Sequence, residues 1–468
     1  MRQEHLESSG VNRLIFIATL ILLLCSITRH LLFCSTLYDL SWFSQSTYLI
    51  SRGMPPLLSF IESSPNLHIL GDHAALILYP LSLLHLIFPS VYWLFLVQAF
   101  ALASAAWPIW YLSLEAGLSR SLSIALVIFY LLNPIVFNVN LFDFHPEIIA
   151  LPLFFWAVLT ARQSRLGWFI ASILLILSCK AVLALTVISM GLWLWWFEKK
   201  KNYGMTAIAL GAAWFILATQ WIIPHFSGEQ PAAVGRYAYL GDSIPQIILN
   251  LILKPGIVLS HLFTGDNFAY LLLLIIPFAW GLYWKQCAPI WVALPMIGLN
   301  LLSTSYPQKD LIHQYNIPIL PFFILAIIAT LAADKGILRT RKAIVIWAII
   351  MFLSLAKFGY FGTKYLASID TWQATREALA YVKTDEPLLT IDKIAPHVDH
   401  RPILKVASLG SENIDLSQFK YILLNQRYPG QRSSSETIAT LKQRLEIDPT
   451  FDRIYNQSDV FLFIASKN

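Results

Sequence analysis

A series of apolar runs, most of them close to the length of a membrane-spanning helix, constrains the fold of this chain more than any other feature. The runs lie near residues 14–34, 91–113, 121–138, 148–161, 167–179, 181–197, 205–223, 268–284, 287–304, 317–333 and 343–360. A span needs about 20 predominantly apolar residues, so the pattern predicts about 11 spans, the shorter of which lean or line a cavity. Because 57% of the residues are apolar and only 13% are charged, the chain lacks the polar surface that a soluble enzyme requires.

The distribution of basic residues indicates how the spans are oriented. The net charge is +6, but the lysines and arginines are scattered between apolar runs, which excludes nucleic acid as a partner and favours the positive-inside pattern. Of the 21 basic residues that precede residue 365, 13 fall in segments assigned to the cytoplasm. We therefore expect a multi-pass protein of the plasma (inner) membrane, embedded in the lipid bilayer, with a cytoplasmic N-terminus and an extracytoplasmic C-terminal domain.

The number of spans, and with it the predicted orientation of the loops, depends on how two segments are interpreted. Residues 167–197 could form one long helix, but basic residues flank both ends, so the charge rule favours two crossings that turn at Cys179–Lys180. Residues 74–88 are apolar but contain Pro80 and His85, and we interpret them as a helix at the membrane interface. The outer face then receives the loops at residues 35–90, 139–147, 224–267 and 305–316.

The composition changes near residue 365. The last 104 residues hold 25 charged side chains, whereas the first 364 hold 35. This change predicts a transmembrane domain over residues 1–364, with its long first loop at 35–90, and a soluble extracytoplasmic domain over residues 365–468. Within the latter, residues 370–382 and 436–445 have helical periodicity, and residues 388–391, 421–424 and 460–464 are typical of short strands. The predicted fold is mainly α, with a small C-terminal α/β domain.

Ionisable side chains gather in the predicted outer loops. Asp39 follows the first span directly, and Asp72 with His73 precedes the interfacial helix. Either aspartate could be an N-cap. We favour the cap for Asp72, whereas for Asp39 a cap on an amphipathic helix and a chemical role both remain open.

The segment Leu141-Phe142-Asp143-Phe144-His145-Pro146-Glu147 is harder to explain by capping. Glu147 could complement the dipole of the helix that follows Pro146, but three ionisable residues on one tight turn exceed that need. Asp143, His145 and Glu147 also have the donor types of a divalent metal site.

Two further outer positions could serve a substrate. Lys180 stands alone at the turn of the apolar hairpin, where it could reach the interface by snorkelling or offer a fixed positive charge to a phosphate. Residues 309–315 include His313 and Tyr315, and they could form a polar loop with an interfacial tyrosine or part of a site.

These features resemble the GT-C glycosyltransferases, polytopic enzymes that take a sugar from a polyprenyl-phosphate donor on the extracytoplasmic side. The resemblance is closer still to a prokaryotic family of membrane proteins, classified as a domain of unknown function and grouped with the GT-C clan. It rests on Tyr38-Asp39-Leu40, Gly71-Asp72-His73, the segment 141–147, His313-Gln314-Tyr315 and Ala395-Pro396-His397. It covers nearly the whole chain. One departure is that Ala181 and Val182 follow the hairpin lysine, where acids are expected.

The resemblance implies a hexosyl or pentosyl transferase of inverting stereochemistry, with a GT-C-like membrane domain. Asp39 occupies the family's position for the base that activates the acceptor, and Asp143 is the second catalytic candidate. The side chains expected to bind the substrate and its phosphate are Lys180, His145, Glu147, His313, Tyr315, Asp72 and His73. Asp143, His145 and Glu147 could hold a divalent metal that bridges the phosphate.

A transporter or flippase for a lipid-linked or small polar substrate is the alternative, because it would use the same charged groups. Transporters tend to show internal repeats and broken helices at the midplane. The sequence has no convincing repeat, and its acids lie at the ends of spans. A scaffold without catalytic activity is disfavoured by the three outer clusters of ionisable residues.

Overall fold

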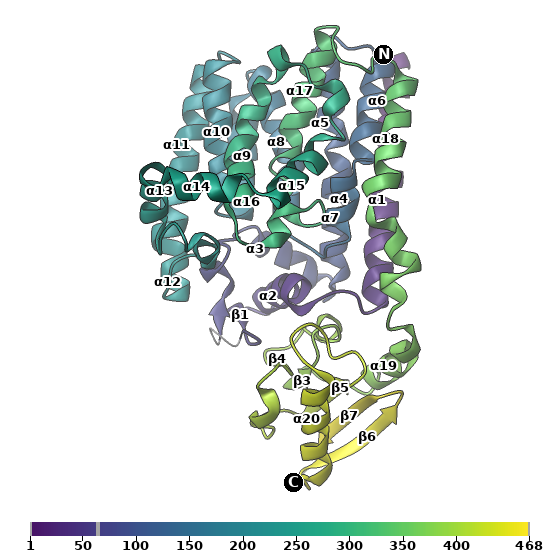
Figure 1. Ribbon diagram of the computed structural model, residues 1–468. Coiled ribbons are helices and arrows are strands. Elements are labelled where there is room, and N and C mark those ends of the chain that lie inside the picture. The colour runs from purple at the N-terminus through teal and green to yellow at the C-terminus, as the bar shows by residue number, and fades with distance from the viewer. Residues whose placement is uncertain (1, 62–65, 467–468) are drawn as a thin grey trace. The chain divides into compact units, whose positions relative to one another are not determined.

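The computed structural model describes residues 2–61 and 66–466 and divides into two compact units (Figure 1). The first unit holds the chain up to Leu24 together with Leu70–Ile77 and Leu96–Lys357, and the second holds Cys25–Ile69, Leu78–Phe95 and the chain from Phe358. The chain therefore leaves the first unit and returns to it twice before its C-terminal part begins. Each unit is described by itself.

The first unit is built almost entirely of helices. Those that lie within it, or begin or end in it, are α1 (Arg2–Leu31), α4 (Tyr92–Ser104), α5 (Ala106–Glu115), α6 (Arg120–Leu131), α7 (Pro134–Asn140), α8 (Glu147–Arg162), α9 (Leu166–Cys179), α10 (Leu183–Trp196), α11 (Lys201–Leu217), α12 (Ile223–Ser227), α13 (Ile244–Leu253), α14 (Pro255–Leu262), α15 (Gly265–Ile275), α16 (Leu294–Leu302), α17 (Leu320–Ala332) and α18 (Arg341–Leu355). The predicted hairpin is confirmed, because α9 ends at Cys179 and α10 begins at Leu183.

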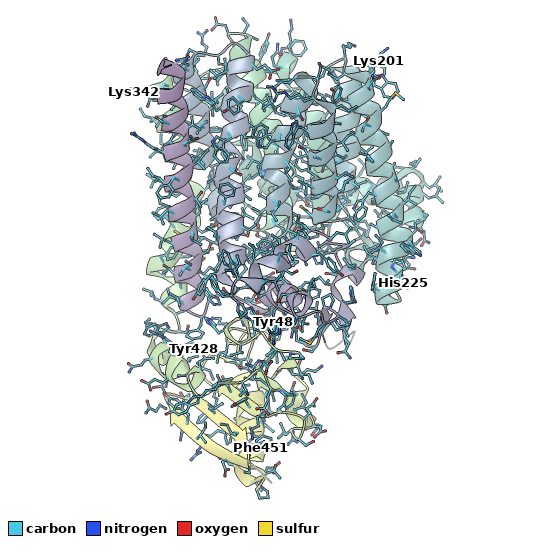
Figure 2. The ribbon with its side chains drawn as sticks, turned by 180° about the vertical axis from the view of Figure 1, so that it is seen from behind. Tyr48, Lys201, His225, Lys342, Tyr428 and Phe451 are labelled. Atoms are coloured by element: carbon cyan, nitrogen blue, oxygen red, sulfur yellow. The ribbon has the colours of Figure 1, made fainter. Side chains whose placement is uncertain are left out.

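Four helical stretches in the described residues are long and apolar enough to cross a membrane, and the number rises to six if each of two bent pairs counts as one span. Five further helices are apolar but have only 10–17 residues. The longest stretch, Lys201–Ser227, runs through α11 into α12, and Figure 2 shows Lys201 and His225 at its opposite ends. The described helices make this an integral membrane protein, and the figure of about 11 spans stays a prediction.

Helices α10 and α11 pack unusually closely because glycines face each other. A Cβ atom at Gly191 would lie 2.7 Å from the carbonyl oxygen of Gly204, and a Cβ atom at Gly204 would lie 2.6 Å from that of Gly191. Small residues at such positions let two membrane helices approach each other backbone to backbone. This contact holds the second arm of the hairpin that carries Lys180.

Residues 224–267, which were predicted as a long outer loop, are largely helical. This stretch contains α13 and α14, which meet at an angle of 94° and run across the upright helices α10 and α11 in Figure 1. The angle forms at Lys254–Pro255, where proline cannot continue the hydrogen-bond ladder of α13. Both helices expose large apolar side chains such as Ile252 and Leu259, as expected where lipid is the solvent.

The second unit begins with the end of α1 and includes α2 (Trp42–Ser51), the strands β1 (Leu57–Leu58) and β2 (Leu67–His68), and α3 (Leu78–Ser82). The two strands pair antiparallel. The predicted interfacial helix is reduced to α3 and a following 3₁₀ turn over Leu83–Leu86. Pro80 lies in the first turn of α3, where a proline is tolerated.

The C-terminal part of the second unit is the predicted α/β fold. Its five-stranded sheet has the order β4-β3-β5-β7-β6, with β3 (Leu388–Thr390), β4 (Leu404–Val406), β5 (Tyr421–Asn425), β6 (Phe451–Gln457) and β7 (Val460–Ala465), accompanied by α19 (Trp372–Leu379) and α20 (Ser435–Ile447). β3 runs parallel to β4 and β5, while β7 pairs antiparallel with β5 and β6.

The sequence patterns identified both helices and the three central strands but missed the two edge strands. β4 has only three residues, and β6 carries mostly exposed polar side chains, so neither shows a clear apolar period. Charged edge strands of this kind also resist pairing with other chains.

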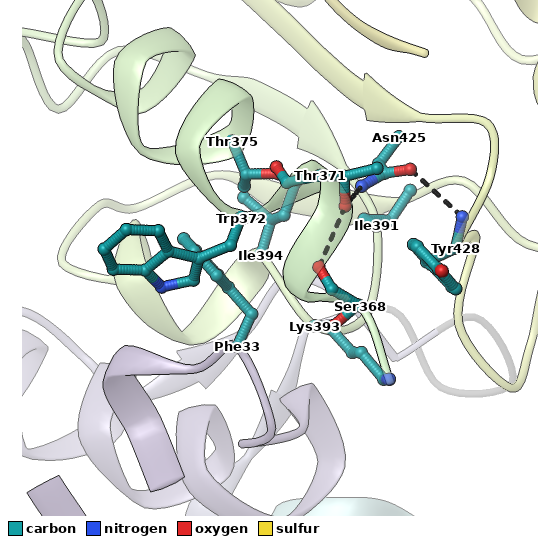
Figure 3. Close-up of a pocket in the computed structure, with 10 residues that line it drawn as sticks. All are labelled: Phe33, Ser368, Thr371, Trp372, Thr375, Ile391, Lys393, Ile394, Asn425 and Tyr428. Atoms are coloured by element: carbon teal, nitrogen blue, oxygen red, sulfur yellow. Dashed lines mark hydrogen bonds between the residues drawn. The ribbon is translucent and has the colours of Figure 1, made fainter. Parts of the chain in front are cut away.

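A small cavity lies between α19, the sheet and Phe33 (Figure 3). Its volume is about 10 Å³, which is room for one water molecule at most. Asn425 bridges it by donating to Thr371 (3.0 Å) and accepting from the backbone N–H of Tyr428 (3.0 Å). The cavity is therefore a feature of packing and is too small for a ligand.

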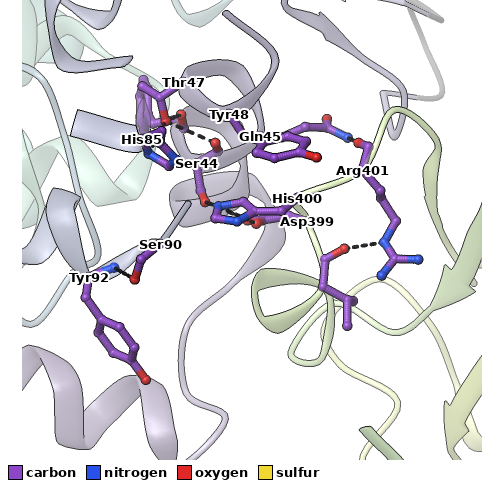
Figure 4. Close-up of polar contacts among 12 residues, drawn as sticks. Ser44, Gln45, Thr47, Tyr48, His85, Ser90, Tyr92, Asp399, His400 and Arg401 are labelled. Atoms are coloured by element: carbon purple, nitrogen blue, oxygen red, sulfur yellow. Dashed lines mark hydrogen bonds and ion pairs between the residues drawn. The ribbon is translucent and has the colours of Figure 1, made fainter. Parts of the chain in front are cut away.

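Helix α2 is joined to residues 398–404 by buried polar contacts (Figure 4). The Ser44 hydroxyl donates to Asp399 Oδ1 (3.1 Å), the Gln45 side chain donates to the carbonyl oxygen of Arg401 (2.9 Å), and Tyr48 stacks on His400 with its ring centroid 4.8 Å away. In the described residues, Asp399 Oδ2 is buried without a hydrogen-bond partner. A protonated carboxyl suits such a position better than a charged one.

This arrangement predicts a pH-dependent stability. Burial raises the pKa of the Asp399 carboxyl to about 7. The group therefore stabilises the fold fully below about pH 4, and this contribution is lost as the pH rises toward 7. We expect Asp399→Asn to match the parent at pH 4 and to exceed its stability at pH 8 by an amount on the order of a few kcal/mol.

Thermal unfolding of the full chain in detergent across this pH range would measure the difference. Asp452→Asn, at an exposed position on β6, is the matched control and should follow the parent at every pH. A difference between Asp399→Asn and the parent that does not change with pH would contradict the prediction.

Candidate functional site

The first unit brings the hairpin lysine against the start of α8. Lys180 lies in extended conformation between α9 and α10, and its Nζ is 2.5 Å from Oε1 of Glu147, the first residue of α8. The side chain of Glu147 is only 5% exposed and that of Lys180 is 17% exposed. Acids were expected directly after Lys180 in the sequence. The carboxylate that pairs with Lys180 comes instead from Glu147 of helix α8.

The segment after Gly71 holds this turn in place through its backbone. The N–H of Ile77 donates to the carbonyl oxygen of Ser178 (3.0 Å), and the N–H of Ala181 donates to that of His73 (3.2 Å). Because a residue on each side of Lys180 is bonded to this segment, Asp72 and His73 come close to the lysine.

Asp72 forms an ion pair with His73 and does not cap α3, which begins at Leu78. Burial alone would raise the pKa of Asp72, but His73, Lys180 and Arg236 together hold it below its ordinary value. The cap interpretation of Asp72 is therefore wrong. The Asp72 carboxyl is instead paired with His73, and its lowered pKa favours the charged form.

Arg236 is a member of the site that sequence reasoning missed. Its guanidinium lies over the ring of Tyr315, 5.3 Å from the centroid, and donates to Gln308 Oε1 (2.9 Å). It lies in a segment that was predicted as a long outer loop. It has no charged neighbours or motif, so no signal in the sequence marked it.

The turn before α8 carries the other predicted residues. Asp143 has a left-handed backbone (φ 64°) and is 1% exposed, a conformation that aspartate tolerates better than most residues. His145 is buried, and its backbone N–H donates to Gln98 Oε1 (3.3 Å). Burial lowers the pKa of His145 to about 3, which favours the neutral imidazole at physiological pH.

Phe142 links this turn to the predicted residues near position 313. Its ring stacks on His145 with centroids 5.3 Å apart and meets the ring of His313 edge to face at 4.0 Å. His313 Nδ1 contacts Asp310 Oδ2 (2.7 Å), and Asp310 Oδ1 also accepts from the backbone N–H groups of Ile312 and His313 (2.8 and 3.0 Å). Asp310 therefore fixes both the loop and the orientation of His313.

We call this assembly the polar cluster. It consists of Asp72, His73, His145, Glu147, Lys180, Arg236, Asp310, His313 and Tyr315, and all its members lie in the first unit. Within the described residues, Lys180 has one hydrogen-bond partner, Glu147. An ammonium group has three donors, so Glu147 uses one N–H donor of Lys180 and orients the side chain.

Asp39 lies in the second unit, in a short π-helical turn (Leu37–Ser41) that continues into α2. The N-cap of this turn is Thr36, and the Thr36 hydroxyl donates to Asp39 Oδ2 (2.5 Å). The capping position is therefore occupied by Thr36, and Asp39 accepts a hydrogen bond from it.

The expectation of a metal held by Asp143, His145 and Glu147 finds no matching geometry. In the part of the chain that the structure describes, no three His, Cys, Asp or Glu side chains are placed to hold a metal ion. Glu147 is instead paired with Lys180. A divalent metal at this turn stays a prediction.

Comparison with known proteins agrees with the fold and the motifs. The model of a family described as "Predicted membrane protein (DUF2079)" matches residues 29–462. No curated protein matches. Two crystal structures of ArnT from Cupriavidus metallidurans, one bound to undecaprenyl phosphate and one in the apo state, superpose with TM-scores of 0.55 and 0.56 at 10% identity. Each alignment covers 97% of this chain and 98% of ArnT. ArnT is a GT-C glycosyltransferase, so the predicted GT-C-like fold is confirmed.

Proposed function

We propose that this chain, which belongs to the DUF2079 family of predicted membrane proteins and has a GT-C fold, transfers a sugar from a polyprenyl-phosphate donor to an acceptor. The sugar is a hexose or pentose, the acceptor lies on the extracytoplasmic face, and the anomeric configuration is inverted. Undecaprenyl phosphate bound to ArnT, which shares this fold over 97% of the chain, supports a polyprenyl-phosphate lipid as the donor carrier.

The observation that carries the proposal is the oriented lysine of the polar cluster. Lys180 is held at the turn of two apolar helices by Glu147, which uses one of its three N–H donors. A polyprenyl phosphate presents its phosphate at the membrane surface while its tail stays in lipid. Lys180 stabilises the phosphate as it leaves the anomeric carbon, with Arg236 as a second cation of the same cluster.

The remaining roles follow from the chemistry of the transfer. The acceptor hydroxyl needs a base as it attacks the anomeric carbon, and Asp39 takes its proton. The phosphate is a good leaving group and needs positive charge more than an acid. His145 and His313, on either side of Phe142, and Asp143 on the same turn orient the substrates.

A transfer assay would test the function directly. The purified full chain in lipid nanodiscs is supplied with polyprenyl-phosphate sugars that carry a labelled hexose or pentose, together with membrane lipids and glycans as acceptors. We expect release of polyprenyl phosphate that depends on the acceptor. Failure to bind any of these donors or to release the lipid would contradict the proposal.

The proposed orientation makes a separate prediction about sidedness. Lys201 and Lys342 lie at the same end of the helices of the first unit (Figure 2), which supports placing both in the cytoplasm with the other basic loop residues. Reporter fusions after Lys201 and after Arg341 should behave as cytoplasmic, and a fusion after Asn468 as extracytoplasmic. A cytoplasmic C-terminus would overturn the assignment of the site to the outer face.

A further inference from the structure

We infer that the C-terminal α/β domain positions Asp39 through two of its residues, Asp392 and Arg432. We call residues 36–39 the Asp39 segment. The inference rests on the proposed function, in which Asp39 is the base, and it assigns the domain a part in the reaction. All the residues involved belong to the second unit.

The first contact fixes the backbone of the Asp39 segment. The N–H of Leu37 donates to Asp392 Oδ1 (3.0 Å), and both residues are buried, with exposures of 0% and 4%. Leu37 opens the π-helical turn, so its N–H has no acceptor within the helix. The carboxylate just beyond β3 supplies that acceptor, at a site where an unpaired N–H would be costly.

The second contact comes from a neighbouring loop of the same domain. The Arg432 guanidinium carbon lies 3.6 Å from the centroid of the Tyr38 ring, a cation–π arrangement. Gly430 allows this loop to approach, since its backbone is left-handed (φ 94°) and a Cβ atom there would lie 2.9 Å from Cβ of Asp392. The loop that carries Arg432 therefore packs against Asp392, and the two residues contact the Asp39 segment from neighbouring positions on the domain.

Together these contacts hold the two residues that precede Asp39, one by its backbone and one by its ring. The carboxylate of Asp39 is then directed by the Thr36 hydroxyl at 2.5 Å. Catalysis by a base requires such placement, and a shift of about 1 Å can cost roughly 100-fold in rate. Asp392 and Arg432 are positioning residues, because they act through the Asp39 segment.

The chain offers a matched control at another contact between the same parts. The Ser59 hydroxyl donates to the carbonyl oxygen of Leu404 (3.0 Å) and accepts from its N–H (2.9 Å). Ser59→Ala removes two buried hydrogen bonds to the domain but none to the Asp39 segment. It therefore reports the effect of a weaker attachment of the C-terminal domain that leaves the contacts of the Asp39 segment in place.

Hydrogen exchange of the full chain in nanodiscs tests the positioning without reference to activity. Asp392→Ala should accelerate amide exchange in peptides that cover the Asp39 segment by about 10–100-fold, the value of a hydrogen bond to a charged group. Asp392→Asn keeps an acceptor oxygen and should restore most of the protection. Ser59→Ala should leave this segment unchanged. Equal exchange in Asp392→Ala and the parent would overturn the inference.

The transfer assay supplies the second readout. Asp392→Ala should lower kcat by about 10–100-fold with an unchanged KM for the donor, Asp392→Asn should recover most of it, and Ser59→Ala should keep the parent kcat. Arg432→Gln should lose about 2–5-fold, and Arg432→Lys should lose less because it keeps the cation. If Ser59→Ala lowers kcat as much as Asp392→Ala does, the effect comes from weaker packing of the C-terminal domain, and the inference is overturned. A parent that transfers no sugar contradicts the proposed function, while the exchange result still decides the positioning.

Discussion

Replacing Asp39 by asparagine should lower the turnover of sugar transfer by about 10²–10⁴-fold, which is the usual contribution of a general base. Asparagine retains an oxygen that accepts from the Thr36 hydroxyl, as Asp39 Oδ2 does at 2.5 Å, so the turn should stay folded. The unfolding temperature of Asp39→Asn should therefore match that of the parent. Steady-state transfer and thermal unfolding of the same preparation measure the two quantities.

A second variant separates the base from the hydrogen bond that holds it. Thr36→Val removes the donor to Asp39 but leaves the carboxylate, so it should lose much less turnover than Asp39→Asn. If Asp39→Asn turns over at nearly the parent rate, Asp39 is a structural residue of the turn and another group must take the proton.

Replacing Lys180 by methionine should weaken binding of polyprenyl phosphate by about 10–100-fold, because a hydrogen bond to a charged partner contributes roughly 1.5–3 kcal/mol. Lys180→Arg keeps the charge and should lose less. Titration of the purified variants in nanodiscs with a labelled polyprenyl phosphate would measure the affinities. Equal affinity in the parent and both variants would leave Lys180 with no role at the phosphate.

The ion pair with Glu147 makes a matched control necessary. Lys180→Met leaves the buried Glu147 carboxylate without its partner, and breaking a buried pair in this way costs about 3–5 kcal/mol. The double variant Lys180→Met/Glu147→Gln removes both charges and should recover most of that stability. If its affinity for the lipid remains as low as that of Lys180→Met, the loss comes from the missing cation. Recovery of affinity with stability would show that Lys180 acts only on the fold.

The sequence predicted those parts of the site that depend on local pattern. Basic residues on both sides of 167–197 were enough to predict a hairpin with Lys180 at its turn, and the spacing of Asp143, His145 and Glu147 marked the turn before α8. The terminal α/β domain was predicted from its rise in charge and its alternating segments. These signals are local, so a reading along the chain detects them.

The partners of these residues could not be predicted in the same way. Glu147 meets Lys180 across 33 positions because backbone bonds from residues 73–77 hold the hairpin turn, and nothing in the composition of either segment encodes that bond. Arg236 lies between apolar helices, in a segment that was predicted to be a loop. Asp392 stands as one acid among many in a charged domain, and only its distance to Leu37 sets it apart. Specific pairing over long separations depends on tertiary packing, which periodicity does not report.

The separation of 355 residues between Leu37 and Asp392 also sets an order of events during biosynthesis. Chains grow from the N-terminus at about 5–20 residues per second, so Asp39 is made roughly 20–70 s before the domain that holds it. Until that domain has been synthesised and folded, the N–H of Leu37 lacks its acceptor and the Asp39 segment is not held in place. In the proposed transfer, the base would therefore be fixed in place only after the C-terminal domain has folded.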